Sequence, residues 1–180
     1  MPLRLALTGL AVLLIGLGYA DGPPPAHTGG FGEPTCLSCH FDGELNAPGG
    51  SLAVDGLPST YTPGQAYPLA IRLSRPGVQR GGFQLSARFA DADHAGRQAG
   101  RFTTPGDRVA TDLQADVVYV RHTPAGTMPL QDTLRWTFDW TAPEAAGGAI
   151  AIHVAANAAN GDDSEFGDYI YALEAIIEAP

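Results

Sequence analysis

Lysine is absent from this 180-residue sequence, so all ten of its positive side chains are arginines. They stand against 19 aspartates and glutamates, which leaves a formal net charge of −9 at pH 7. An acidic chain of this kind is repelled by phosphate backbones and by anionic lipid headgroups. The composition therefore argues against nucleic acid and anionic membranes as partners, whereas a protein with a basic face would be attracted to it.

Cysteine is almost as scarce. The only two, Cys36 and Cys39, lie in the stretch Cys36-Leu37-Ser38-Cys39-His40. Two thiols at this spacing can form thioether bonds to the vinyl groups of a porphyrin, and the histidine that follows can bind the iron from one face. The C-x-x-C-H pattern therefore predicts one covalently attached haem c, held by Cys36, Cys39 and His40.

Three other functions of the motif compete with haem attachment. A thioredoxin-like redox pair lies near a βαβ pattern, which this sequence does not show. A structural zinc site needs four ligands, and neither a second C-x-x-C nor a closely spaced histidine pair follows downstream. A short Cys36–Cys39 disulfide in an exported protein remains open.

Long hydrophobic runs are also missing. The one extended apolar run, from Leu5 to Leu17, is shorter than the roughly 20 residues that a membrane-spanning helix needs. It follows Arg4 and precedes Gly18-Tyr19-Ala20, which is the arrangement of a secretory signal peptide. We therefore expect residues 1–20 to direct export to the periplasm or the extracellular space and then to be removed, with no stable membrane insertion afterwards. An uncleaved N-terminal anchor is the alternative.

Sustained helical periodicity is absent after residue 20. Residues 21–50 are rich in glycine and proline and predict an extended, poorly ordered lead-in with one helical turn around the cysteines. In residues 51–180, apolar and polar residues alternate between turn residues, which predicts an all-β antiparallel sandwich of about seven or eight strands. The clearest strands are expected within residues 67–73, 83–89, 117–120, 134–140, 150–154 and 169–177.

The second axial ligand of the iron has several candidates. His122 ends the predicted strand and opens a Pro/Gly loop, so a rigid sheet would hold it while its side chain projects beyond the strand. We therefore expect His40 and His122 to bind the two faces of the iron. Met128 and His27 are the alternatives, and an open sixth position is another.

The remaining polar and aromatic clusters have ordinary structural explanations. His94 lies in a polar turn, and His153 lies on the face of its strand opposite to the apolar residues. The aromatic residues within 136–140 are expected in the core. The acidic loop 162–168 could hold calcium, but its spacing fits no familiar calcium loop and a solvated loop is favoured. No phosphate loop, serine nucleophile elbow or H-E-x-x-H occurs, so nothing points to an enzyme.

The segment Thr28–His40 resembles the opening of exported bacterial Reeler-like proteins (reelin-type, also called choice-of-anchor V proteins). Later segments resemble the same family in the same order: residues 61–65, 82–85, 119–123, 136–143 and 155–162. The resemblance implies an immunoglobulin-like β-sandwich preceded by a C-x-x-C-H, with a histidine at the position of His122. Relatives often end in a sorting or membrane anchor, whereas this sequence ends at Glu178-Ala179-Pro180, so we expect a free exported protein.

Three functions follow from these patterns. The first is an exported mono-haem, c-type cytochrome-like electron carrier that exchanges electrons with redox partner proteins. The second is an extracellular binding or adhesion module with a Cys36–Cys39 disulfide. The third is a haem sensor or enzyme with an open sixth position. The first is favoured because no other catalytic machinery accompanies the motif. Association of copies stays open, although no residue pattern indicates it.

Overall fold

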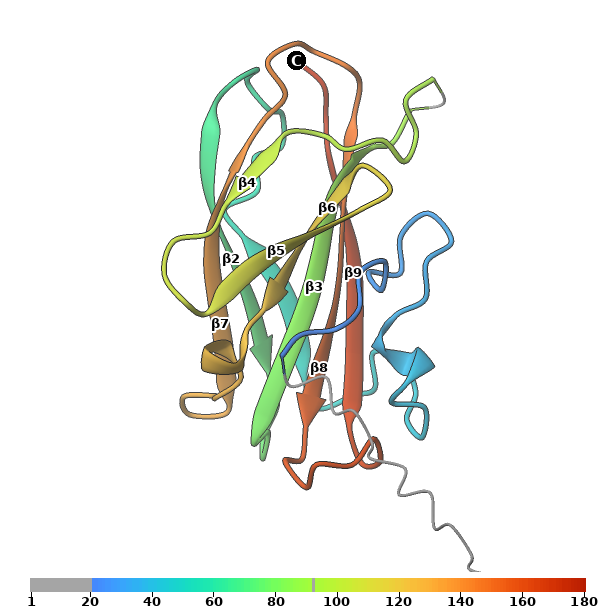
Figure 1. Cartoon of the computed structure of the whole chain (residues 1–180), viewed down its shortest axis with the longest axis vertical. Coiled ribbons are helices and arrows are strands. Elements are labelled where there is room, and N and C mark those ends of the chain that lie inside the picture. Colours follow the sequence, from blue (N-terminus) through green and yellow to red (C-terminus); the bar gives the residue numbers. More distant parts are fainter. Residues whose placement is uncertain (1–20, 92) are drawn as a thin grey trace, which may run out of the picture.

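Two antiparallel β-sheets pack face to face (Figure 1). The computed structural model describes residues 21–91 and 93–180. The four-stranded sheet has the order β1-β2-β7-β4, with bounds Ser51–Asp55, Ala66–Ser74, Thr133–Thr141 and Arg101–Thr103. The five-stranded sheet has the order β5-β6-β3-β8-β9, with bounds Val109–Gln114, Val117–His122, Arg80–Phe89, Ile150–Ala159 and Tyr169–Ile177. The predicted all-β antiparallel sandwich is confirmed. The predicted signal peptide, residues 1–20, lies outside the described residues.

The strands that alternation predicted are all present, and three further strands accompany them. These are β1, β4 and β5, and none of them has a clear apolar face: Val109 of β5 is the only fully buried residue among the three strands. They lie at sheet edges, where one side of a strand meets solvent and its sequence carries little hydrophobic signal. Of the edge strands in the described residues, β9 alone was predicted by the pattern of the sequence.

The core lies between the two sheets and is dominated by aromatic residues. Trp136, Phe138 and Trp140 of β7 are at most 1% exposed, which confirms their predicted position. The Trp136 indole N–H donates to the carbonyl oxygen of Gly126 at 2.8 Å, and that of Trp140 donates to the carbonyl oxygen of Ala99 at 3.0 Å. Both tryptophans thus bury their rings without leaving the indole N–H unpaired.

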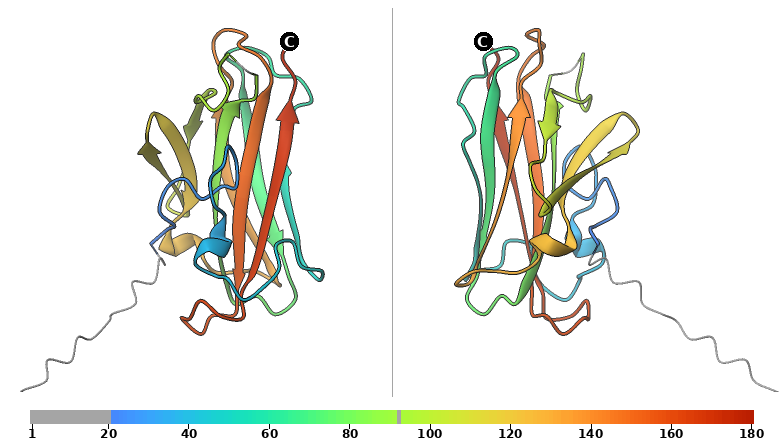
Figure 2. Two further views of the ribbon diagram at one scale, coloured as in Figure 1. Left: turned by 90° about the vertical axis from the view of Figure 1, so that its right-hand side faces the viewer. Right: turned by 60° about the vertical axis from the view of Figure 1, so that its left-hand side comes forward.

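The lead-in, residues 21–50, forms a further layer on the outer face of the five-stranded sheet, beside β8 and β9 (Figure 2). Glu33 attaches it to the sheet. Its carboxylate accepts hydrogen bonds from Thr28 Oγ1 and Tyr119 OH, each at 2.6 Å, and pairs with Arg88 of β3. The two charged side chains are only 10% and 6% exposed. The lead-in is therefore folded against the sheet, unlike the poorly ordered segment that its composition predicted.

Further bonds extend this attachment along the lead-in. The amide of His27 donates to Gln84 Oε1 at 2.7 Å, and Gln84 Nε2 donates to the carbonyl oxygen of Pro24 at 2.9 Å. Phe31 packs edge-on against His153, with ring centroids 5.3 Å apart. The outer face of β8, on which the alternation placed His153, is thus a second packed surface. Within residues 21–91 and 93–180, no helix has the length and apolar character to cross a bilayer.

Candidate functional site

A cavity of about 480 Å³ lies where the lead-in, the outer face of the five-stranded sheet and the β8–β9 loop meet. The lead-in lines it with Pro23, Pro24, His27, Cys36, Ser38, Cys39 and His40. The strands and the loops that follow them add Arg80, Gly81, Gly82, Phe83, His122, Thr127, Asn157 and Ala159. The β8–β9 loop closes one side with Gly161, Asp163, Ser164, Glu165 and Asp168. Segments far apart in the sequence thus share one concave site.

The C-x-x-C-H residues lie in the short 3-10 helix η1 (Cys36–Ser38) and the turn that follows it. Thr35 caps the helix, because its side-chain oxygen accepts a hydrogen bond from the Leu37 amide at 3.2 Å. The amide of His40 closes the turn by donating to the carbonyl oxygen of Cys36 at 3.0 Å. This single turn brings both cysteines and the histidine to the same cavity.

Both cysteines are free thiols. Cys39 is exposed and Cys36 is partly buried, and burial raises the pKa of the Cys36 thiol to about 12. A redox-active or metal-binding C-x-x-C instead depends on a thiol whose pKa is lowered toward neutrality. The environment of Cys36 is therefore unlike that of a thioredoxin-like pair.

His122 enters the cavity from the end of β6 and is 7% exposed. Its Nδ1 lies 3.0 Å from the amide nitrogen of Phe83 and 3.3 Å from the carbonyl oxygen of the same residue. An Nδ1 that accepts from the Phe83 amide puts the proton of the neutral ring on Nε2, whereas an Nδ1–H that donates to the Phe83 carbonyl oxygen leaves the Nε2 lone pair for another partner. Burial lowers the pKa of His122, and the nearby charge of Arg121 lowers it further against an opposing effect of the Phe83 backbone. The neutral imidazole that metal binding requires is favoured.

His40 reaches the cavity from the opposite side, where its Nδ1 lies 2.8 Å from Asp168 Oδ2. The side chain of Asp168 is 1% exposed, while that of His40 is 28% exposed. A buried carboxylate thus faces one nitrogen of a partly open imidazole. This pairing orients the ring.

The alternative ligands separate into two groups. His27 lines the same cavity, and its Nδ1 lies 3.1 Å and 3.0 Å from the carbonyl oxygens of Pro24 and Pro25. Met128 is 58% exposed and is not among the residues that line the cavity. The structure therefore brings His27 to the site together with the four residues of the main prediction, but not Met128.

Sequence reasoning missed Gly81, Gly82 and Asn157 as contributors to the site, and it did not place Asp168 beside His40. A methyl group on Gly82 would overlap the His122 ring, and one on Gly81 would meet the Leu134 side chain and the carbonyl oxygen of Asn157. Asn157 of β8 contacts both His40 and Asp168. Two adjacent glycines inside a strand are a recognised signal for close approach of another group, so the glycine pair could have been found from the sequence. Asn157 carries no such signal.

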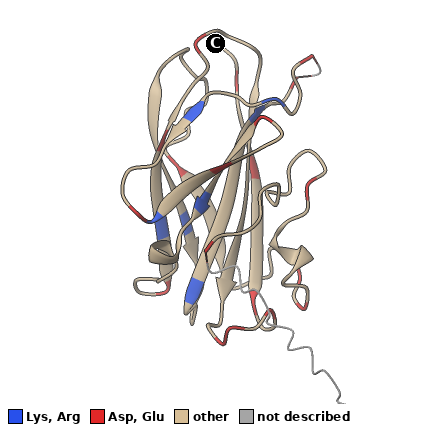
Figure 3. Ribbon diagram, viewed as in Figure 1, with Lys and Arg blue, Asp and Glu red and all other residues tan. Residues whose placement is uncertain are grey.

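The acidic loop between β8 and β9 forms the rim of the cavity, and Figure 3 shows acidic residues gathered there. Asp162 is bound within the loop itself, since its Oδ1 accepts a hydrogen bond from the Ser164 amide at 2.9 Å. Across the described residues, no three His, Cys, Asp or Glu side chains converge as a metal-binding group would require. The loop carboxylates therefore do not converge on one point in this arrangement.

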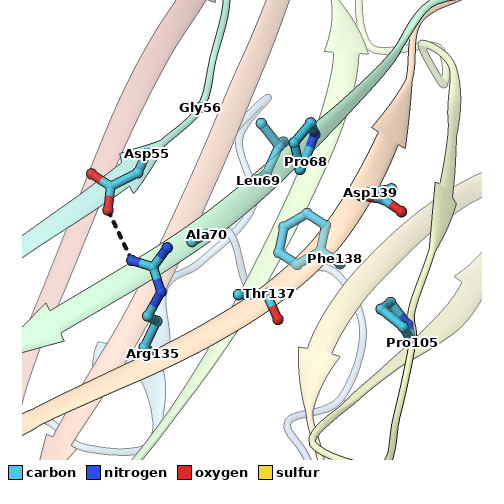
Figure 4. Close-up of a pocket in the computed structure, with 10 residues that line it drawn as sticks. All are labelled: Asp55, Gly56, Pro68, Leu69, Ala70, Pro105, Arg135, Thr137, Phe138 and Asp139. Atoms are coloured by element: carbon cyan, nitrogen blue, oxygen red, sulfur yellow. Dashed lines mark hydrogen bonds and ion pairs between the residues drawn. The ribbon is translucent and has the colours of Figure 1, made fainter.

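A second hollow, of about 360 Å³, lies on the outer face of the four-stranded sheet (Figure 4). Its polar groups form an exposed ion pair, in which Asp55 accepts hydrogen bonds from Arg72 at 3.1 Å and from Arg135 at 3.2 Å. The hydrogen bond from Arg72 contributes most to lowering the pKa of Asp55. These charges pair with one another at the surface. This hollow is therefore a weaker candidate for a functional site than the cavity beside the two cysteines.

Comparisons with known proteins bear on the architecture. No family model and no curated protein matches the sequence. The solved reeler domain of human F-spondin matches with a TM-score of 0.53 and 20% sequence identity, over 77% of this chain and 95% of that one. The fold is Reeler-like. The Reelin-N domain of F-spondin also matches, over 80% of this chain and 96% of that one, at 22% identity and a TM-score of 0.49. The match to the human F-spondin reeler domain confirms, as a fold, the Reeler-like sandwich implied by the sequence resemblance.

Proposed function

We propose that this protein is an exported electron carrier with one c-type haem. Cys36 and Cys39 would hold the porphyrin through thioether bonds, and His40 and His122 would bind the two faces of the iron. The observation that carries the proposal is that these four side chains, from two distant segments, line one cavity. Chance would not be expected to bring a C-x-x-C-H and a buried histidine to the same concave surface.

The cavity fits a flat, largely apolar group. Its volume lies within the roughly 300–1,000 Å³ that is usual for cofactor sites. Pro23 and Pro24 supply apolar walls, and the ring of His122 lies against the backbone of Gly82. The sandwich thus supplies the wall that a single helical turn lacks.

The two thiols suit covalent attachment. Each cysteine would add its S–H bond across a vinyl group, with sulfur bonding to one carbon and hydrogen to the other, so the addition needs reduced thiols and no oxidant. Cys36 and Cys39 are both free, and the raised pKa of Cys36 keeps that thiol protonated at neutral pH. The prosthetic group would then stay bound outside the cell.

The two histidines are suited to fill both axial positions of the haem iron. Burial lowers the pKa of His122, which favours the neutral imidazole, and the tautomer whose Nδ1–H donates to the carbonyl oxygen of Phe83 at 3.3 Å would leave Nε2 available. His40 has its Nδ1 directed at Asp168 and likewise retains Nε2. Haem with both axial positions filled transfers electrons without binding substrate. This favours a carrier over a sensor or an enzyme.

The acidic rim supports a protein partner of opposite charge. Asp163 and Glu165 line the mouth of the cavity in a chain of net charge −9. A redox partner with a basic face would be steered to this edge, and salt would slow their association. Export to the periplasm or the extracellular space belongs to the same proposal, because covalent haem attachment in bacteria takes place there.

The proposal is tested by exporting the protein in a host with haem-attachment machinery and measuring its pyridine haemochrome spectrum and intact mass. We expect one covalent haem per chain, lost in a Cys36→Ala, Cys39→Ala double variant. A haem-free product lighter by two hydrogen atoms than the reduced chain would instead establish the disulfide, and with it a binding or adhesion module. A haem protein that is high-spin and binds carbon monoxide readily would favour the sensor or enzyme.

A further inference from the structure

Asp168 is a buried carboxylate at the edge of the cavity, at the start of β9. Its Oδ1 accepts a hydrogen bond from the Asn160 amide at 3.0 Å. Its Oδ2 accepts one from Asn157 Nδ2 at 2.9 Å and lies 2.8 Å from His40 Nδ1. An ionised carboxylate is strongly disfavoured in a protein interior unless donors of this kind surround it. Two of the three donors are the Asn160 amide and Asn157 Nδ2, and the third is the imidazole of His40, the residue after Cys39.

The contact fixes which nitrogen of His40 carries the proton. A carboxylate accepts hydrogen bonds and cannot donate them, so His40 must present Nδ1–H to Asp168. In the neutral ring the proton is then absent from Nε2, whose lone pair is left for another partner. Asn157 does not donate a hydrogen bond to this Nε2 lone pair. Its Nδ2 lies 3.3 Å from both ring nitrogens, whose lone pairs point away from each other, so it cannot lie along either.

Asn157 also holds the carboxylate in register with the imidazole. Its Nδ2 donates to the same Oδ2 that faces His40, while its own Oδ1 is buried without a partner. Exchanging the two amide atoms would satisfy neither group, because an amide oxygen would then face the carboxylate oxygen. The side-chain oxygen of Asn157 is thus left without a partner, while its Nδ2 holds Asp168 in contact with His40.

We propose that Asp168 is a positioning residue for His40. It fixes the imidazole tautomer with Nε2 unprotonated, and its charge makes the ring a stronger electron donor through the Nδ1–H bond. Resting on the proposed haem function, this predicts that Asp168 biases the iron toward its oxidised state. No feature of the C-x-x-C-H motif itself specifies this bias.

The test compares two variants of the exported holoprotein that lose the same charge. Asp168→Asn removes the charge that bonds to His40, whereas Asp163→Asn removes a charge that lines the same cavity and has no bond to that ring. We expect Asp168→Asn to raise the midpoint potential by about 59 mV, equivalent to a tenfold change in the oxidised-to-reduced ratio for one electron. The Asp163→Asn variant should shift it by clearly less. Equal shifts, or no shift in Asp168→Asn, would overturn the positioning role and leave the haem proposal intact.

A second measurement separates this proposal from the function on which it rests. Nitrogen-15 NMR of histidine-labelled, full-length protein prepared without haem reports the tautomer that His40 adopts in the absence of iron, and needs no variant to fold. We expect the Nδ1–H tautomer in the wild-type chain under conditions in which the imidazole is neutral. A predominant Nε2–H tautomer would overturn the Asp168–His40 pairing. Absence of covalent haem together with the Nδ1–H tautomer would refute the electron carrier while the pairing stood.

Discussion

The imidazole of His122 lies where a side chain on Gly82 would be. A Cβ atom built on Gly82 falls 2.6 Å from Nδ1 of the ring and 2.8 Å from Nε2, which is closer than real Cβ contacts allow. The φ angle of Gly82 lies outside the left-handed region, so the glycine is needed for space and not for backbone conformation. Residue 82 therefore determines how closely the His122 ring can approach β3.

Gly82→Ala should displace the His122 ring and weaken the bond that this ring is proposed to make to the haem iron. We expect the visible spectrum of the oxidised protein to change from low-spin toward high-spin, in the same direction as His122→Ala. Gly106→Ala is a suitable control, because Gly106 faces open space at a φ of +79° and its replacement strains the backbone away from the cavity. A low-spin spectrum in Gly82→Ala, identical to that of the control, would show that the ring position does not matter.

The choice of distal ligand can be tested with three single variants. His122 and His27 both line the cavity, whereas Met128 is exposed outside it. We expect His122→Ala to convert the oxidised protein to a high-spin form that binds carbon monoxide after reduction. His27→Ala and Met128→Leu should keep the low-spin spectrum. If His27→Ala alone abolishes it, the distal ligand is His27 and the assignment of His122 is wrong.

Removing Glu33 should loosen the lead-in. Glu33→Gln leaves the charge of Arg88 buried with no opposite charge, a change that typically costs about 3 kcal/mol in the free energy of unfolding. Chemical denaturation should show this loss, and hydrogen exchange should show faster exchange across residues 28–35. Glu144→Gln is the matched control, because its ion pair with Arg101 is exposed and should contribute less than about 1 kcal/mol. Equal effects of the two variants would contradict the anchoring role of Glu33.

Because of the buried Glu33 carboxylate, we also expect the protein to lose stability in acid. Burial acts to raise the pKa of Glu33, but hydrogen bonds from Thr28, Tyr119 and Arg88, with the charge of Arg88, hold it below its ordinary value. Because the folded pKa is the lower one, the unfolded chain binds more protons at acidic pH. The contribution of Glu33 is complete above its unfolded pKa, roughly 4.3, and disappears as the pH falls through the folded pKa. Unfolding free energies measured across this range should fall less steeply in Glu33→Gln than in the wild type.

Much of the sandwich could be read from the sequence, because strands with one buried face show their period directly. Trp136, Phe138 and Trp140 are an example, since each lies in the core as the alternation predicted. The third layer could not be read in this way. It depends on polar pairs such as Glu33 with Arg88, and no local pattern reveals which distant residue satisfies a buried charge.

The candidate site was predictable in part for the same reason. The C-x-x-C-H has a fixed spacing, and the position of His122 at a strand end could be inferred from the pattern around it. Asp168 and Asn157 have no such spacing to His40, because they reach it only through the pairing of β8 with β9 and the fold of the lead-in. The residues proposed to orient the ligand could therefore not be found from the sequence, whereas the residues proposed to bind it could.

The central claim, a haem held covalently by Cys36 and Cys39, is tested most directly by the pyridine haemochrome spectrum of the exported protein. The account predicts the spectrum of a haem attached through two thioether bonds, with one haem per chain, and its loss in the Cys36→Ala, Cys39→Ala variant. Export and folding of that variant should be checked by its circular dichroism. A wild-type protein that passes through the haem-attachment machinery and emerges without covalent haem would contradict the account.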